Sequence, residues 1–214
     1  MRRDTGEAWT RYVEHGFVLA LGAGTLPKPA FQHFLRQDYL FLIQFARAYA
    51  LAGYKSADLR DLRAASASVA AIVDVEMPLH VAYCREWGLT EDDMAAEPEA
   101  LETVAYTRFV LERGMSGDRL DLEVALVPCV VGYAEAVDRL LRNPRTVTHG
   151  NPYAAWMETY AGADYRALAV AAIGNLDRLG ATRGAEARYA DLLATFTAAT
   201  RLEASFWDMG LAAA

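Results

Sequence analysis

The sequence predicts an all-α fold, and three observations support that prediction. Apolar residues recur at spacings of three and four along nearly all of the 214 residues. No pair of alternating apolar and polar runs is joined by a hairpin turn. Glycine and proline fall between the periodic segments, where helices begin and end. We therefore expect one domain, residues 1–214, built as a bundle of about eight or more helices.

The predicted helices follow one another with short connections. Asp4 and Glu7 have the spacing of a capping box, which predicts the start of the first helix. Pro29 suits the first position of the second helix, and Gly53 suits its end. Asn151 is expected to cap a shorter helix late in the chain. The predicted ranges are about 4–21, 29–52, 56–69, 70–87, 99–113, 118–141, 151–160, 162–179 and 185–210.

Composition excludes several classes of protein. The net charge is −7 and basic residues are scattered, which argues against a nucleic-acid-binding groove. The polar N-terminus lacks the apolar core of a signal peptide, and no stretch approaches the roughly 18 apolar residues of a membrane span. We expect a cytoplasmic protein whose two cysteines, Cys84 and Cys129, are free thiols. Cys84 is interpreted as a packing residue.

Two carboxylates fall within apolar helix faces. Asp38 lies three and four residues from Phe34, Leu35, Phe41 and Leu42, so its side chain points inward and needs a partner. Glu203 has the same relation to the apolar stripe of the last helix. A structural ion pair for Asp38 and an exposed helix edge for Glu203 are the alternatives.

Pro128 and Cys129 lie side by side inside a predicted helix. Proline in a helix interior removes a backbone hydrogen bond and bends the helix, at a cost of roughly 3 kcal/mol. Cys129 shares a face with Tyr133, so the bend can direct the thiol into a cavity. The alternative is that Cys129 is a small apolar core residue.

Several tyrosines add polar groups to the same interior. Tyr106 lies in the middle of a helix, and Tyr153, Trp156 and Tyr160 share one helix face. Aromatic stripes usually form core, but a buried tyrosine hydroxyl requires a partner. Inward carboxylates, a thiol and hydroxyls from four or five helices predict a polar pocket for a flat, nitrogen-rich small molecule.

Metal and haem binding are poorly supported by the sequence. Glu76 and His80 are four residues apart and can present two ligands on one helix face, but the paired Glu-x-x-His motifs of di-iron bundles are missing. His15 has a solvent-facing or capping position. We expect neither a metal ion nor a cofactor.

Five stretches, taken in order, resemble the TenA family, also called thiaminase II or aminopyrimidine aminohydrolase. They are GTLPKPAFQHFLRQDYLFLIQFARAYA, TVAYTRFVL, ALVPCVVGYAEAV, NPYAAWMETYA and RLEASFWDM, and the resemblance covers about residues 8–210. It implies a haem-oxygenase-like helical bundle that binds no haem and usually forms a homotetramer. It also implies hydrolysis of 4-amino-5-aminomethyl-2-methylpyrimidine to the hydroxymethyl pyrimidine and ammonia, with thiamin as a secondary substrate.

The resemblance also implies roles for six residues. Cys129 matches the nucleophile, and Glu203 matches the acid that protonates the leaving amine. Asp38 matches the carboxylate that holds the pyrimidine, and the pocket tyrosines match Tyr106, Tyr133 and Tyr160.

One position departs from the family pattern, since Phe41 stands where many members have a tyrosine that supports the cysteine. The alternatives are another enzyme on the same scaffold, such as a cofactor-free oxidase or a metal-dependent oxygenase, and a non-catalytic pyrimidine-binding or regulatory protein.

Overall fold

The computed structural model describes all residues from 1 to 214 and consists of helices and connecting loops, without a strand. The all-α prediction is therefore confirmed. In chain order the helices are α1 (Glu7–Val13), α2 (Gly16–Gly22), α3 (Lys28–Tyr54), α4 (Leu59–Ala71), the π-helical turn η1 (Ile72–Glu76), α5 (Met77–Arg85), α6 (Glu91–Ala95), α7 (Leu101–Ser116), α8 (Arg119–Arg142), α9 (Ala154–Ala161), α10 (Ala163–Thr182) and α11 (Tyr189–Ala212).

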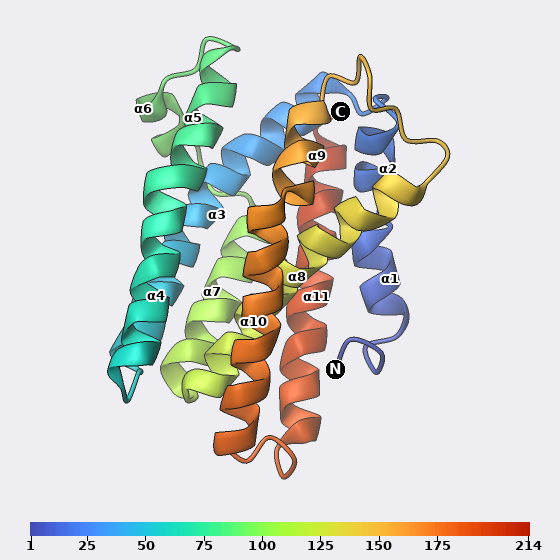
Figure 1. The fold of residues 1–214 in the computed structure, drawn as a ribbon. Helices are drawn as coiled ribbons and strands as arrows, with labels where there is room; N and C mark the ends of the chain where they lie inside the picture. The colour runs from blue at the N-terminus through green and yellow to red at the C-terminus, as the bar shows by residue number, and fades with distance from the viewer.

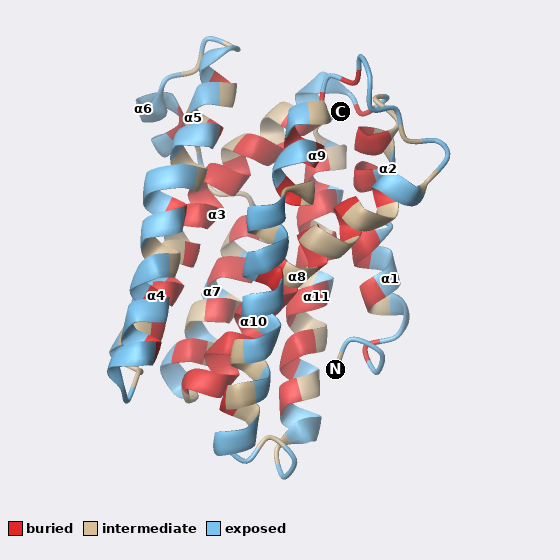
Figure 2. Cartoon of the chain, viewed as in Figure 1, coloured by how far each residue is buried: buried red, intermediate tan, exposed pale blue.

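The helices form a bundle whose centre is occupied by the longest ones (Figure 1). Helices α4 and α5 lie at one edge, and α1 and α2 lie at the opposite edge. Figure 2 shows that α3 and α11 are largely buried, whereas the outward faces of α4, α5 and α10 are exposed. The fully buried Trp207 of α11 packs against Phe17, Phe34 and Tyr133, with ring centroids 5.0, 5.0 and 5.1 Å away. Apolar faces of α2, α3, α8 and α11 therefore meet around one indole ring.

The predicted first helix is two helices in the structure. Gly6, with φ of 60°, precedes α1, and no side chain caps that helix, so the predicted capping box of Asp4 and Glu7 is wrong. The chain breaks at His15, which has extended backbone angles and whose Nδ1 accepts a hydrogen bond from the Phe17 N–H at 3.2 Å. Its Nε2 lies 3.0 Å from Asp208 Oδ1. His15 therefore caps α2, the role that the sequence favoured over haem ligation.

The predicted helices 56–69 and 70–87 form one continuous helix, because η1 joins α4 to α5 without a break. This helix, Leu59–Arg85, has a segment of mean hydropathy 1.3 and is long and apolar enough to cross a membrane by length and composition alone. Asp74 and Glu76 interrupt this helix, so the prediction that no stretch approaches 18 uncharged apolar residues holds. Its inner face carries the buried Ala65, Ile72 and Cys84, which belong to the core of the bundle.

Helix α8 continues through Pro128, and its neighbours stabilise the bend. The Tyr12 hydroxyl donates a hydrogen bond to the Pro128 carbonyl oxygen at 3.3 Å. Gly132 lies one turn further on and leaves room for the same ring, since a Cβ atom there would lie 2.0 Å from Tyr12 Cε1. Because residue 132 is a glycine, the ring of Tyr12 in α1 can pack against the backbone of α8 next to Cys129.

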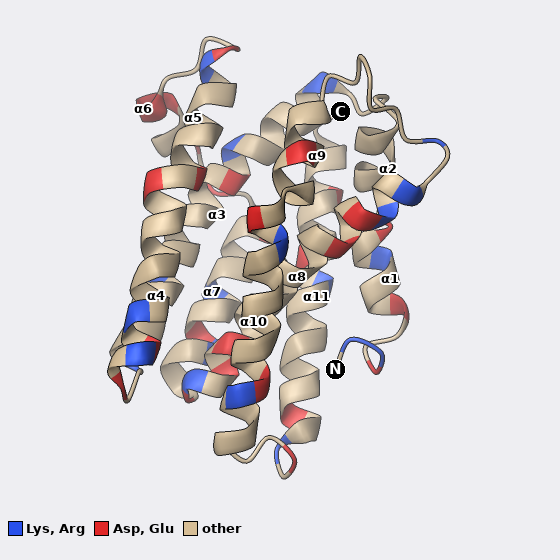
Figure 3. Ribbon diagram, in the orientation of Figure 1, with Lys and Arg blue, Asp and Glu red and all other residues tan.

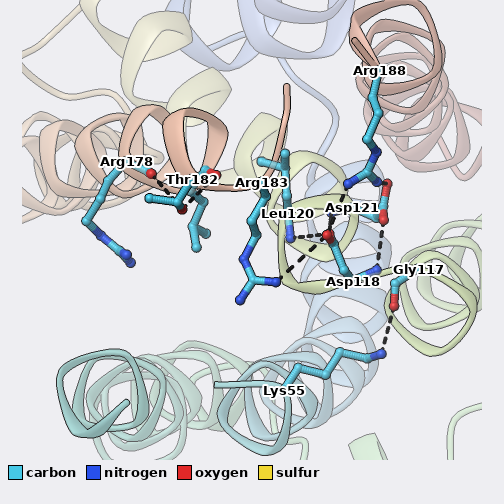
Figure 4. A network of polar contacts seen from close by, with 10 residues as sticks. Lys55, Gly117, Asp118, Leu120, Asp121, Arg178, Thr182, Arg183 and Arg188 are labelled. Carbon is cyan, nitrogen blue, oxygen red and sulfur yellow. Dashed lines mark hydrogen bonds and ion pairs between the residues drawn. The ribbon is translucent and has the colours of Figure 1, made fainter. Parts of the chain in front are cut away.

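A polar network joins three loops at one end of the bundle (Figure 4). Lys55 Nζ, just after α3, donates to the Gly117 carbonyl oxygen at 2.7 Å. Asp118 caps α8 and binds Arg188 at 3.0 Å and Arg183 at 3.8 Å from the loop between α10 and α11. Exposed ion pairs of this kind contribute little each, roughly 0–1 kcal/mol. In Figure 3, basic and acidic residues are interspersed, and no basic stripe is visible.

Candidate active site

A cavity in the middle of the bundle brings together most of the residues predicted from the sequence. This inner cavity has about 560 Å³ of atom-free space, part of it open to solvent, between α3, α4, η1, α8, α9 and α10. The side chains in its wall that carry a polar group are Asp38, Tyr49, Ser68, Glu76, Cys129, Tyr133, Tyr160 and Tyr165.

The buried carboxylate of Asp38 has the partner that its position on α3 requires. Its Oδ2 lies 2.7 Å from Nε2 of His80 on α5, and Nδ1 of His80 lies 3.0 Å from the Glu76 carbonyl oxygen. Burial lowers the pKa of His80, but the hydrogen bond and charge of Asp38 outweigh burial and raise it above its usual value. The raised pKa favours the imidazolium form of His80 beside the Asp38 carboxyl group, whose Oδ1 is left to accept a hydrogen bond from a ligand.

Cys129 is partly exposed because it forms part of the cavity wall. Burial raises the pKa of its thiol well above the usual value, and the charges of Glu203, Asp38 and Glu76 raise it further. A thiolate would thus be surrounded by carboxylates, which disfavour its negative charge. The thiol is neutral at physiological pH, so attack on a ligand requires transfer of its proton in the same step.

Glu203 lies behind the cavity and is only 2% exposed, so the alternative of an exposed helix edge is wrong. The Tyr106 hydroxyl donates a hydrogen bond to its Oε1 at 2.7 Å. Burial raises the pKa of Glu203 to about 8, although polar contacts with Tyr106, Cys129 and Tyr12 oppose the shift. Glu203 therefore carries a proton in most molecules at neutral pH, and it contacts the thiol.

The three predicted tyrosines have different positions. Tyr133 and Tyr160 line the inner cavity, with ring centroids 5.0 Å apart. Tyr106 is absent from the cavity wall, because the ring of Phe41 stands there with its centroid 5.0 Å from that of Tyr106. Tyr106 stays a predicted pocket tyrosine, and its hydroxyl donates a hydrogen bond to Glu203 beside the thiol.

Sequence reasoning missed the roles of three residues in or beside this cavity. Glu76 and His80 were considered as a metal-ligand pair, but both ring nitrogens of His80 have partners within the chain. Burial raises the pKa of Glu76 to about 7, while the charge of His80 lowers it. Tyr165 enters the wall from the first turn of α10. The spacing of Glu76 and His80 signalled a shared helix face, but no sequence pattern pairs His80 with Asp38.

Comparison with known proteins identifies the family. The model of the TENA/THI-4/PQQC family matches residues 2–213, and the chain belongs to this family. It is 38% identical over 203 residues to an uncharacterized protein of Haemophilus influenzae, covering 95% of this chain and 93% of that one. It is 36% identical over 201 residues to a protein of Halalkalibacterium halodurans named aminopyrimidine aminohydrolase, covering 94% of this chain and 89% of that one.

A solved structure has the same architecture. The crystal structure of a protein from Silicibacter, described as a TenA family transcription regulator, has a TM-score of 0.90 and 47% sequence identity. The match covers 99% of this chain and 94% of the other. This similarity confirms the predicted haem-oxygenase-like helical fold.

Proposed function

We propose that the protein hydrolyses 4-amino-5-aminomethyl-2-methylpyrimidine to the 5-hydroxymethyl compound and ammonia, with thiamin as a possible second substrate. The observation that carries this proposal is that Asp38 and Cys129 meet in one cavity, with Glu203 in contact with the thiol. The name of the Halalkalibacterium halodurans relative supports the same reaction class.

The inner cavity supplies what an aminopyrimidine ring needs. Asp38 accepts hydrogen bonds from the 4-amino group and from a protonated ring nitrogen, and His80 orients the carboxyl group through its hydrogen bond. The rings of Tyr133 and Tyr160 provide aromatic surfaces for the flat ring. Asp38 thus binds the substrate as well as forming the structural ion pair considered as its alternative.

Hydrolysis proceeds through a covalent adduct. Cys129 Sγ forms a bond to an electron-poor ring carbon, and the displaced electron pair goes to a ring nitrogen, which takes the proton that the thiol gives up. The reacting form is the neutral amine, which a ligand bound as an ammonium ion gives by losing a proton to water. The C–N bond of the methylene group then breaks, and Glu203 gives its proton to the leaving amine as ammonia. Water adds to the methylene carbon and returns a proton to Glu203. The C–S bond breaks last, sulfur regains its proton, and the ring becomes aromatic again.

Two other functions fit the site less well. The Silicibacter relative is described as a transcription regulator. A regulator that only binds a small molecule needs neither a thiol nor a contacting acid in its pocket. Direct binding to nucleic acid also requires a basic surface, and this chain has net charge −7. An oxidase or a metal-dependent oxygenase on the same scaffold remains the other alternative.

The reaction is tested by product analysis. Purified protein is incubated with the aminomethyl pyrimidine, and ammonia, the hydroxymethyl pyrimidine and dissolved oxygen are measured together. The proposal predicts equal amounts of the two products without oxygen uptake. Oxygen consumption coupled to turnover would instead support an oxidase, and tight binding without either product would support a binding protein.

We also propose that the chain assembles as a homotetramer. Support comes from exposed apolar side chains on the outward faces of η1 and α10, where Val73, Val75 and Val170 are 50, 59 and 70% exposed. Sedimentation equilibrium of the purified chain tests this state.

A further inference from the structure

A second cavity adjoins the inner one. This outer cavity lies between η1–α5 and α9–α10 and holds about 1290 Å³ of atom-free space, part of it open to solvent. The two cavities share five wall residues, so nothing but side chains separates them. The shared residues are Ala71, Glu76, Tyr160, Tyr165 and Leu168.

Glu76 is the acidic residue in the wall that the two cavities share. It ends η1, and π-helical turns inside α-helices occur frequently at functional sites. Nδ1 of His80 forms a hydrogen bond with the backbone carbonyl oxygen of Glu76, but no side-chain cation forms an ion pair with the Glu76 carboxylate. The fold therefore holds a carboxyl group at the junction that has no ion-pair partner of its own, because the nearby His80 pairs with Asp38.

Aromatic and acidic residues line the outer cavity. Tyr83 and Trp156 both belong to its wall, together with Tyr160 and Tyr165. Asp164 adds a second carboxylate to the wall. The carboxylates and aromatic rings match a substituent that carries positive charge.

We infer that Glu76 binds the positively charged part of the 5-substituent, an ammonium or thiazolium group, where it passes from the inner into the outer cavity. This inference rests on the proposed function, which places the pyrimidine ring against Asp38 and Cys129 in the inner cavity. The substituent on the methylene carbon must then leave that cavity, and Glu76 lies at its junction with the outer one. Glu76 is thus a specificity-determining residue that favours cationic over neutral substituents.

The test compares two ligands that share the ring and differ in charge. The 5-aminomethyl pyrimidine is a cation at neutral pH, and its N-formyl derivative is neutral. Dissociation constants are measured by calorimetry in the Cys129→Ser background, which blocks turnover, with and without Glu76→Gln. We expect Glu76→Gln to weaken binding of the amine at least tenfold and binding of the N-formyl compound less than twofold.

Controls separate charge recognition from damage to the fold. Glu76→Asp keeps the charge and should keep the preference, and Glu158→Gln removes an exposed carboxylate of α9 outside both cavities and should change neither constant. Equal loss for both ligands in Glu76→Gln would overturn the inference. The inference would also be overturned if protein with Glu76 intact bound both ligands equally well or bound neither. This comparison does not need the Gln variant, so it decides the question even if that variant does not fold.

Failure of the inference is distinguishable from failure of the proposed function. Turnover of the aminomethyl pyrimidine by the wild type reports on the function, whereas the charge preference in binding reports on Glu76. Ammonia release by the wild type, together with an unchanged preference of Glu76→Gln for the cationic ligand, would support the hydrolase function and overturn only the inference about Glu76.

Discussion

Replacing Glu203 by Gln should change how the stability of the protein depends on pH. The folded-state pKa of Glu203 is raised to about 8 from an unperturbed value of 4.5, chiefly by burial. Between these values the folded chain holds a proton that the unfolded chain has lost. The contribution of this proton to the free energy of unfolding is therefore fully present below pH 4.5 and is lost as pH rises through about 8. Over that pH range the loss amounts to about 5 kcal/mol.

The assay is urea unfolding of the wild type and Glu203→Gln at one protein concentration, at pH 6.0 and 7.5. Gln resembles the protonated acid in shape and can still accept the hydrogen bond from Tyr106, so the two proteins should differ by no more than about 1 kcal/mol well below pH 4.5. By pH 6 the wild type should already have lost about 2 kcal/mol relative to the variant. From pH 6.0 to 7.5 the wild type should lose about 2 kcal/mol relative to the variant. Parallel pH dependences would mean that Glu203 is ionised in the folded protein, and would refute its role as a proton donor.

Two further substitutions test the site and the bend beside it. Phe41→Tyr places a hydroxyl in the wall that also contains Cys129 and should raise kcat for the aminopyrimidine several-fold; an unchanged or lower kcat would show that the thiol gains nothing from a hydroxyl there. Gly132→Ala would bring a Cβ atom to 2.0 Å from Tyr12 and should lower the free energy of unfolding by about 1–3 kcal/mol in urea titration. Gly174→Ala in α10 is the control, because a Cβ atom added there meets no side chain within 4 Å. This substitution should raise the free energy of unfolding by about 0.5–1 kcal/mol, and equal effects of the two substitutions would contradict the packing argument.

Helical periodicity was sufficient to predict the interior of the site. Asp38 and Glu203 were placed inward from the spacing of their apolar neighbours, and both are buried in the structure. Cys129 was assigned to the pocket from Pro128 and the face shared with Tyr133, and both residues line the inner cavity. These predictions succeeded because the 3.6-residue repeat fixes which side of a helix a residue occupies.

Features that depend on contacts between distant segments were not predictable. His80 lies 42 residues from Asp38, and only the packing of α5 on α3 brings them together. The hydrogen bond from Tyr106 to Glu203, 97 residues away, likewise depends on the packing of α7 on α11. The π-helical turn at Ile72–Glu76 has no composition signal, so 56–87 was divided into two helices. The break at His15 was missed because a side-chain cap within an apolar run resembles a continuing helix.

The central claim is that Cys129 is the nucleophile of an aminopyrimidine hydrolase. Its most direct test measures ammonia release from 4-amino-5-aminomethyl-2-methylpyrimidine by the wild type and by Cys129→Ser, with urea unfolding of both proteins as the check on the fold. We predict release by the wild type and none by the variant, at equal stability within about 1 kcal/mol. Full activity of a folded Cys129→Ser protein would contradict the claim, and no release by either protein would direct attention to another substrate, with Phe41 the first residue to question.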